Sequence, residues 1–456
     1  MIRPRTTVRV SPRAVRVFVI ARRPPRTDAA PMRVTSTPAV IDATRSVAST
    51  KAAARLVSLD VVRGAVMVLM AIDHVRVYSG LPAGGPTAGI FFTRWITHFC
   101  APAFVFLAGT AAFLHGRTLD DAGRLARYLV TRGAVLVLLE LTVIRVAWTF
   151  NVDFAHYILA GVIWMLGWCM ILLAALVWFP AAAVGIAGVI VIAAHNVVDL
   201  APPARLQTLH PSWIWQLLYF GGVFQVGGGD DAPAVAVLYS IVPWIGVMAA
   251  GYGFGTILTR EPAKRRRLCL MIGLSAIALF VVLRGLDLYG DPRHWSTTPA
   301  SAPPALFRFL NTTKYPASLL FLLMTLGPVI ALLPLAERAR GAAGGVLATF
   351  GRVPMFYYLL HIPVIHAAAL VVSYAREGRV NAWLFANHPM MNPPPPPGYT
   401  WSLPLLYVVF VVVIALLYFP CRWFARVKSR RRVILRRARR APPVRGKGLS
   451  PTYCST

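Results

Sequence analysis

Ten apolar segments, each long enough or nearly long enough to cross a bilayer, dominate this chain of 456 residues. A transmembrane helix needs about 20 mostly apolar residues, and a soluble protein of this length would need far more polar surface than 14% charged residues provide. The sequence therefore predicts an all-α, polytopic membrane helix bundle of about ten transmembrane helices. The predicted spans are 60–79, 95–115, 127–147, 154–178, 180–198, 235–259, 267–286, 315–336, 346–374 and 401–421.

Most of the formal net charge of +31 lies at the two ends of the chain. Residues 1–55 contain 12 Lys or Arg and two Asp, and residues 421–447 contain 12 Lys or Arg and no acidic residue. Cationic segments beside a span attract anionic lipid, and an excess of Lys and Arg marks the cytoplasmic side. We therefore predict an inner-membrane protein with both termini in the cytoplasm, and membrane lipid rather than nucleic acid as the partner of the tails.

The same patterns divide the chain into three regions. We predict a basic, disordered extension over 1–55, a transmembrane domain over 56–421 and a basic cytoplasmic tail over 422–456. The predicted outer connections near 199–234, 287–314 and 375–400 are long, which is typical of functional or disordered loops. The five cysteines show no metal-ligand spacing, so we predict no metal site and no disulfide framework.

The first span, SLDVVRGAVMVLMAIDHVR over 58–76, has ionisable residues at both ends. Asp60 and Arg63 lie at one end, and Asp73 and His74 at the other. At 1.5 Å and 100° per residue, Arg63 and His74 fall on one helix face about 16 Å apart. An ion pair at one end and a hydrogen-bonded interfacial His at the other would be purely structural. Because charges at membrane depth are costly, a functional stripe facing the protein interior is the alternative.

Further polar residues are predicted to reach the same outer layer. His98 enters in the second span at the depth of His74, so the two imidazoles could act as a general base and its partner or remain separate packing residues. Asp73 could orient one of the rings. The other predicted members of this layer are His156, His195, Asn196, Asp199 and Lys314, and their convergence suggests a pocket.

Glu140 lies near the middle of the third predicted span, in RGAVLVLLELTVIR. An unpaired carboxylate at that depth would be neutralised or functional. A structural clamp to Arg132 or Arg145 is one interpretation. A proton relay through Glu140, His361 and His366 is the other.

Several segments resemble a known family. SLDVVRGAVMVLMAIDH and THFCAPAFVFLAG resemble the transmembrane acyltransferases typified by heparan-alpha-glucosaminide N-acetyltransferase, and more closely the bacterial membrane-protein branch of that superfamily. The similarity extends in chain order over about 55–375. The further segments are RGAVLVLLELTVIR, HNVVD, VPWIGVMAAGYGFG, YGDPRHW, NTTKYPASLLFLLMTLGP and FGRVPMFYYLLHIPVIH.

The resemblance implies transfer of an acetyl group across a membrane, from cytosolic acetyl-CoA to an amino sugar on the far side. Acetyl-CoA or another acyl-CoA would then be a co-substrate, with no permanently bound cofactor. The family's typical enzyme has an Asn near the outer end of its first helix and a catalytic His in the following loop. Here His74 falls at or next to the Asn position, and no His occurs between Val75 and Thr97. His98 lies close to the position of a family Asp.

The sequence therefore favours an acyltransferase that modifies an extracytoplasmic saccharide or envelope component. In this hypothesis His74, His98 and Asp73 are catalytic, Arg63 and Asp60 bind the donor, and Lys314, His156, Asn196 and Asp199 bind the acceptor. A homodimer is compatible with it. A proton-coupled transporter using the same residues is the alternative, although no internal repeat is visible in the sequence. A lipid-organising or assembly protein is the third, non-catalytic interpretation.

Overall fold

The computed structural model describes residues 39–85, 87–119, 121–227, 232–296, 303–339, 341–391 and 394–440. The chain divides into two units, Met1–Thr50 and Lys51–Thr456. Helix α1 (Ala39–Ser79) begins in the first unit, and everything below concerns the second. Most of the predicted extension, and the predicted tail from residue 441, lie outside the described residues.

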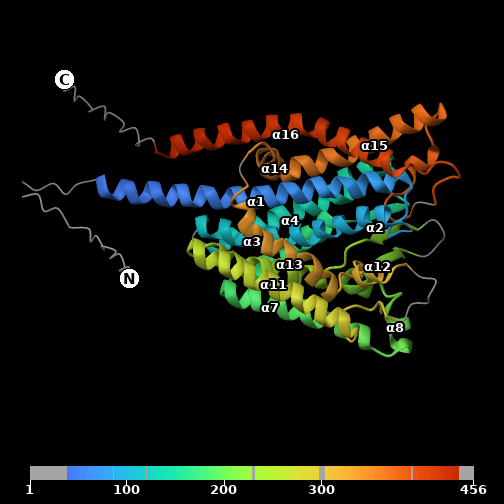
Figure 1. Ribbon diagram of the computed structural model, residues 1–456, viewed down its shortest axis with the longest axis horizontal. Coiled ribbons are helices and arrows are strands. Elements are labelled where there is room, and N and C mark those ends of the chain that lie inside the picture. The colour runs from blue at the N-terminus through green and yellow to red at the C-terminus, as the bar shows by residue number, and fades with distance from the viewer. Residues whose placement is uncertain are drawn as a thin grey trace, which may run out of the picture. The chain divides into compact units, whose positions relative to one another are not determined.

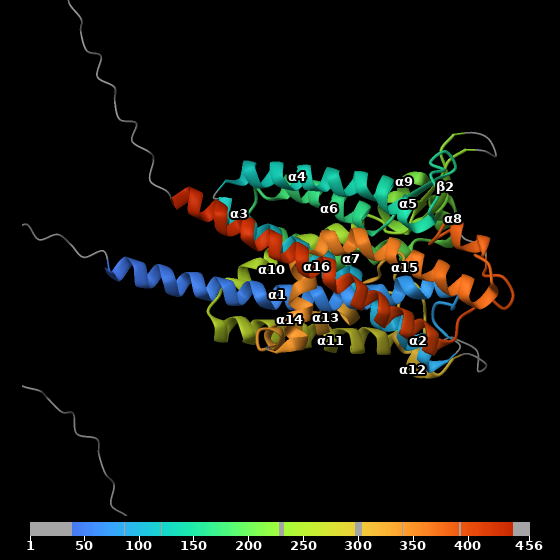
Figure 2. The ribbon, with the colours of Figure 1, turned by 90° about the horizontal axis from the view of Figure 1, so that it is seen from above.

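The second unit is a set of helices that run back and forth between two ends (Figures 1 and 2). We call the end with the short connections 119–122, 258–262 and 336–342 the turn end, and the opposite end, with the β-strands, the loop end. The long helices after α1 are α3 (Cys100–Leu119), α4 (Ala122–Leu139), α6 (Val162–Leu176), α7 (Ala181–Ala194), α10 (Val242–Leu258), α11 (Pro262–Leu286), α13 (Leu319–Ala336), α14 (Ala342–Arg352), α15 (Pro354–Glu377) and α16 (Leu403–Arg440).

Shorter elements complete the unit. The short helices are α2 (Ala88–Trp95), α5 (Arg145–Thr149), α8 (Pro203–Leu209), α9 (Trp213–Trp215) and α12 (Ala305–Leu310). Three 3-10 turns cover Ile96–Phe99, His195–Leu200 and Ala382–Phe385, and two π-helical turns cover Glu140–Ile144 and Gln216–Phe220.

Six helical stretches of the described residues are long and apolar enough to cross a membrane. They are Ala88–Leu119, Ala181–Leu200, Pro262–Leu286, Leu319–Ala336, Pro354–Glu377 and Leu403–Arg430. Helices α6 and α10 are apolar but shorter. The predicted class, a helical multi-pass membrane protein, is therefore confirmed, whereas the count of about ten spans and the cytoplasmic placement of the termini stay predictions.

A small sheet at the loop end was not predicted. Strands β1 (Tyr157–Ala160), β2 (Gly222–Gln225) and β3 (Ala234–Val237) form it in the order β1-β3-β2. β3 pairs in parallel with β1 and antiparallel with β2. Two predicted spans, 154–178 and 235–259, therefore begin as strands and become helical only at Val162 and Val242.

The predicted span 346–374 is two helices instead of one. Helix α14 ends at Arg352 and α15 starts at Pro354, with Val353 between them at φ −129°. A residue that precedes proline is driven out of the helical region by contact with the proline ring, and proline itself is tolerated at the first helical position. At the other end of the chain, α16 continues without a break past the predicted domain boundary at residue 421.

Glycines let the helix backbones approach closely. An added Cβ at Gly251 of α10 would overlap the carbonyl oxygen of Phe106 on α3, and one at Gly109 of α3 would overlap that of Met248. Small residues at such crossings allow helix association in lipid, where packing replaces the hydrophobic effect as the driving force. Reciprocal glycine contacts of the same kind join α7 to α10 (Gly185, Gly253), α4 to α6 (Gly133, Gly167) and α11 to α13 (Gly273, Gly327).

We predict that Gly251→Ala destabilises the protein, whereas Gly285→Ala does not. Both changes add one methyl group inside a helix, and alanine favours the helix over glycine by about 1 kcal/mol. At Gly285 nothing lies within 4 Å of the new Cβ, but at Gly251 the backbone of α3 must move. Overpacking costs about 1–3 kcal/mol. For each variant, the melting temperature is the temperature at which the detergent-solubilised protein loses its monodisperse peak in size-exclusion chromatography. Equal melting temperatures for the two variants would contradict the prediction.

Candidate active site

Two imidazole rings from helices far apart in the sequence meet inside the bundle. His74 Nδ1 on α1 lies 2.8 Å from His361 Nε2 on α15, and the ring centroids are 4.9 Å apart. His361 is fully buried, whereas His74 is partly accessible. The edge of the His74 ring also packs against Trp148, with centroids 4.8 Å apart. The two rings form a hydrogen-bonded pair between the first and ninth predicted spans.

The backbone determines which nitrogens of this pair carry protons. His361 Nδ1 lies 2.6 Å from the carbonyl oxygen of Tyr358, which can only accept a hydrogen bond. In a neutral pair His361 Nδ1 is therefore protonated and its Nε2 accepts. His74 Nδ1 must then donate, so that the lone pair of the dyad resides on His74 Nε2. This is the arrangement that a general base requires: an oriented imidazole whose second nitrogen is free to take a proton.

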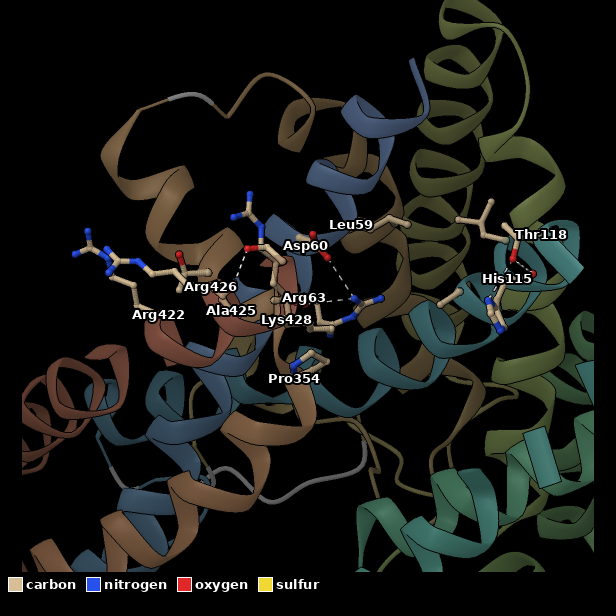
Figure 3. Close-up of a pocket in the computed structure, with 16 residues that line it drawn as sticks. Leu59, Asp60, Arg63, His115, Thr118, Pro354, Arg422, Ala425, Arg426 and Lys428 are labelled. Carbon is tan, nitrogen blue, oxygen red and sulfur yellow. Dashed lines mark hydrogen bonds and ion pairs between the residues drawn. The ribbon is translucent and has the colours of Figure 1, made fainter. Parts of the chain in front are cut away.

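A chain of two connected cavities leads from the turn end toward this pair. The outer cavity, about 880 Å³, is shown in Figure 3, and the inner cavity measures about 380 Å³. Arg63, Ala111, His115 and Pro354 line both, so the two are continuous. The inner cavity lies between α1, α3, α4, α6 and α15 and reaches Tyr358, whose carbonyl holds His361.

A buried apolar layer separates the inner cavity from the imidazoles. Met67 lines the cavity, and Met70, one turn further along the same face of α1, is buried. The Tyr357 hydroxyl donates to the Met67 carbonyl oxygen at 3.0 Å and ties α15 to α1 at this level. His74 lines neither of the two cavities. Met67 and Met70 are thus buried on α1 between the lining of the inner cavity and His74.

The ionic groups at the turn end of α1 face the outer cavity, as Figure 3 shows. Asp60 and Arg63 form the predicted ion pair, with Oδ1 and Nη1 3.5 Å apart. Arg63 Nη1 also lies 3.4 Å from the carbonyl oxygen of Gly351 at the end of α14. Arg63 is thus fixed at the junction of the two cavities, on the helix face that also carries Met67 and His74.

Asp73 does not orient an imidazole, contrary to the sequence-based expectation. Its carboxylate accepts from Arg76 Nε at 3.0 Å and from Arg94 Nη1 at 2.5 Å. A buried carboxylate between two guanidinium groups uses its hydrogen-bonding capacity on them, which leaves the dyad to be oriented by a backbone carbonyl. Asp73 instead joins the loop end of α1 to α2.

The pairing of His74 with His98 was also wrong. His98 lies in the turn between α2 and α3, its ring packs against Phe321 at 5.5 Å, and its Nδ1 is buried without a hydrogen-bond partner. Among the described residues, no hydrogen bond or ring contact joins His98 to His74. The ring that completes the pair is His361, which the sequence suggested as a member of a proton relay with Glu140 and His366.

The predicted acceptor-binding residues occupy different parts of the loop end. Asn196 Oδ1 accepts from the Leu319 N–H at the start of α13, and its Nδ2 donates to Asp199 at 2.7 Å, so this pair has a structural task. His156 is exposed and bonded to Asp153, and this hydrogen bond holds the pKa of the Asp153 carboxyl below its usual value.

Lys314, the remaining predicted acceptor residue, is buried beside two aromatic rings. Its Nζ lies 5.2 Å from the Tyr315 ring centroid and 5.9 Å from that of Tyr239. It forms no ion pair with a carboxylate among the described residues, although its charge acts on Asp73. Lys314 thus adds positive charge beside the Asp73–Arg76–Arg94 group.

Glu140 is held by backbone rather than by arginine. Its carboxylate accepts from the N–H groups of Ile163 at 2.9 Å and Trp164 at 3.3 Å, at the start of α6. The predicted clamp was wrong, because Arg145 donates to the carbonyl oxygens of Tyr157, Asn151 and Asp153. The unsatisfied N–H groups and dipole of a helix N-terminus favour a carboxylate. Gly161 leaves room for it, since a Cβ there would overlap the Glu140 carboxylate.

The residues that make the outer cavity basic were not predicted from the sequence. Besides Arg63, its cationic lining consists of Arg352, Arg422, Arg426 and Lys428. Arg422, Arg426 and Lys428 belong to the basic run after the last predicted span, but a basic run on a flexible tail and one on a helix that folds over a cavity look alike in sequence. Among the described residues, no group of three or more His, Cys, Asp or Glu is arranged to hold a metal ion.

The apolar helices, the buried imidazole pair and the cavity with a basic mouth define a multi-pass membrane protein with an internal site. Residues 55–288 match the family described as heparan-alpha-glucosaminide N-acetyltransferase, catalytic. The match covers just over half of the chain, and the chain belongs to this family of membrane acetyltransferases. The search of curated proteins found no match. His74 and His98 lie inside the matched region, whereas His361 and α16 lie beyond it.

We predict that Gly161→Ala and Glu140→Ala are energetically coupled. Each change alone should lower the unfolding temperature, because the first displaces the carboxylate and the second leaves two N–H groups of α6 without an acceptor. In the double variant the added methyl group no longer meets a carboxylate, so the two effects should not add. Neighbouring residues show interaction energies of about 0.5–3 kcal/mol. Strict additivity in a thermal double-mutant cycle would refute the contact.

Proposed function

We propose that this protein transfers an acyl group from cytosolic acyl-CoA, acetyl-CoA in the simplest case, to an extracytoplasmic saccharide or envelope acceptor. The turn end would face the cytoplasm of the cell carrying it in its inner membrane, and the loop end the outside. The observation that carries this proposal is the His74–His361 dyad above a cavity whose mouth is basic. Membership of a membrane acetyltransferase family supports the reaction class.

The charges at the turn end support the orientation and the donor. Positive residues concentrate on the cytoplasmic side of membrane proteins, and five Lys or Arg against one Asp line the outer cavity. Guanidinium groups bind phosphates through charge-assisted hydrogen bonds. With the nucleotide in the outer cavity, the pantetheine arm would follow the inner one past Arg63 toward Met67. The thioester would then reach His74 once the Met70 layer moves aside.

The chemistry follows from the protonation states of the dyad. His74 Nε2 would take a proton from the acceptor amine or hydroxyl as its nitrogen or oxygen attacks the thioester carbonyl. A C–N or C–O bond forms, the C–S bond breaks, and the proton on His74 passes to the departing CoA sulfur. His361, held by the Tyr358 carbonyl, would orient His74 and share its positive charge. The net result is an acylated acceptor and CoA thiol.

The acceptor would bind beside the positively charged residues at the loop end. Lys314, Arg76 and Arg94 face a single carboxylate, Asp73, in a region that is largely buried. This surplus would suit an acceptor that carries an anionic group, and His98 and Asp73 would border the same region. Asn196, Asp199 and His156 would shape it at a greater distance.

We predict that His74→Ala lowers the turnover number by about 10²–10⁴-fold, the usual contribution of a general base. His361→Ala should lower it less, because His74 would keep its basic nitrogen but lose its orientation. His210→Ala is the matched control, since this exposed histidine stacks on Phe220 in a loop. The measurement is transfer from labelled acetyl-CoA to an amino-sugar acceptor by protein in nanodiscs. Full activity of His74→Ala would overturn the mechanism. Exchange of labelled solute across vesicle membranes in the absence of acyl-CoA would indicate a transporter instead.

We predict that Lys314→Met raises the KM for an anionic acceptor by about 10–100-fold, the value of a hydrogen bond to a charged group. The KM for the acyl donor should stay unchanged, because Lys314 lies at the opposite end from the basic cavity. Steady-state kinetics with each substrate varied in turn separates the two. A change confined to the donor KM would contradict this assignment.

A further inference from the structure

Residues 422–429 of α16 form one wall of the outer cavity. Arg422 and Arg426 are four residues apart on this helix and both line the cavity, together with Arg63 of α1 and Arg352 of α14 (Figure 3). Both lie beyond the family match, which ends at residue 288. The wall is therefore a feature of this chain that the family assignment does not account for.

Contacts with its neighbours hold this part of α16 in position. Phe424 stacks on Phe356 of α15, with centroids 4.5 Å apart and planes at 17°. Lys428 Nζ donates to the Arg352 carbonyl oxygen at 2.7 Å, at the C-terminal end of α14, where the helix dipole favours a cation. Cys421 and Leu417 are buried, so the helix enters the region already packed. Arg422 and Arg426 are therefore presented from a docked helix.

The two arginines repel each other and lack an acidic partner. Like charges four residues apart on a helix are destabilising. In the part of the chain that the structure describes, neither Arg422 nor Arg426 forms an ion pair with a carboxylate. The single acidic residue of the cavity, Asp60, is paired with Arg63. Figure 3 shows Arg422 and Arg426 beside each other and apart from Arg63. The cavity thus has two separate cationic groups and a volume that admits a sizeable anion.

We propose that Arg422 and Arg426 bind the ribose 3′-phosphate of the acyl-CoA donor, while Arg63 and Arg352 face its diphosphate. This inference rests on the proposed function, and it assigns part of the donor-binding site to helix α16. A ligand with phosphates at two positions matches cationic residues that come from different helices, and a guanidinium fork suits a terminal phosphate dianion. Phosphate groups of anionic lipids share this chemistry, so the test must separate the two sources.

The test compares CoA with 3′-dephospho-CoA, by calorimetry on full-length protein in phosphatidylcholine nanodiscs. Wild-type protein should bind CoA about 10–100-fold more tightly than dephospho-CoA, as expected for hydrogen bonds between charged groups. R422Q/R426Q should lose most of this preference and bind dephospho-CoA as wild type does. R266Q/R267Q removes the same charge from exposed positions at the turn end and should keep the preference.

The other possible results contradict either the proposed 3′-phosphate site or the proposed acyl transfer. Equal binding of the two ligands by wild type, or an unchanged preference in R422Q/R426Q, overturns the inference; binding of phosphatidylglycerol that falls in R422Q/R426Q would then identify a lipid site. The wild-type comparison needs no substitution, so misfolding of a variant cannot obscure it. CoA binding that depends on α16, without acyl transfer, would refute the proposed function and leave the donor site standing. Absence of CoA binding by wild type rejects both.

Discussion

Polar groups buried inside this helix bundle depend on partners within the protein, and for several of them the backbone supplies those partners. Glu140 is satisfied by two N–H groups of α6, and Arg145 by carbonyl oxygens of the 151–157 segment. Arg284 is likewise held by the carbonyl oxygens of Phe309, Arg293 and Arg308. These partners of Glu140, Arg145 and Arg284 lie at helix ends or in connecting segments, where backbone groups lack helical partners. The Tyr358 carbonyl acts in the same way on His361, and through it on His74.

This dependence on backbone partners explains why the site lies where it does. One face of helix α1 carries Arg63 at the cavity junction and His74 near the loop end. Helix α15 begins at Pro354, which lines both cavities, and brings Tyr358 and His361 against that face. The break between α14 and α15 also frees the Gly351 and Arg352 carbonyl oxygens, which accept from Arg63 and Lys428. The break at Pro354 therefore shapes the mouth of the cavity, and α15, which begins there, carries His361.

Local sequence patterns predicted the helical class, the Asp60–Arg63 pair and the stripe on α1, because these depend on composition and helical periodicity. They could not predict that His74 pairs with His361, 287 residues away, rather than with His98 in the neighbouring span. They also could not predict that Glu140 and Asp73 bind partners other than those that charge and proximity suggested. Spacing along one helix says which side chains share a face, but not which helix covers that face. The short strands escaped prediction because β1 and β3 each continue an apolar run that reads as part of a span.

The two ends of the bundle differ in how their charged residues are arranged, and the dyad lies between these ends. At the turn end, five Lys or Arg side chains and one Asp line the open outer cavity. At the loop end, Asp73, Arg76 and Arg94 are packed against one another, with Lys314 close by and largely buried. Along α1, the buried Met67 and Met70 lie between Arg63 at the cavity junction and His74. In the proposed reaction, the nucleotide of the donor would stay in the outer cavity while the thioester reaches His74. Only the Met67 and Met70 side chains would have to move. Flexible methionine side chains can move without disturbing the helices around them, so the burial of Met67 and Met70 is compatible with transfer of a small acyl group.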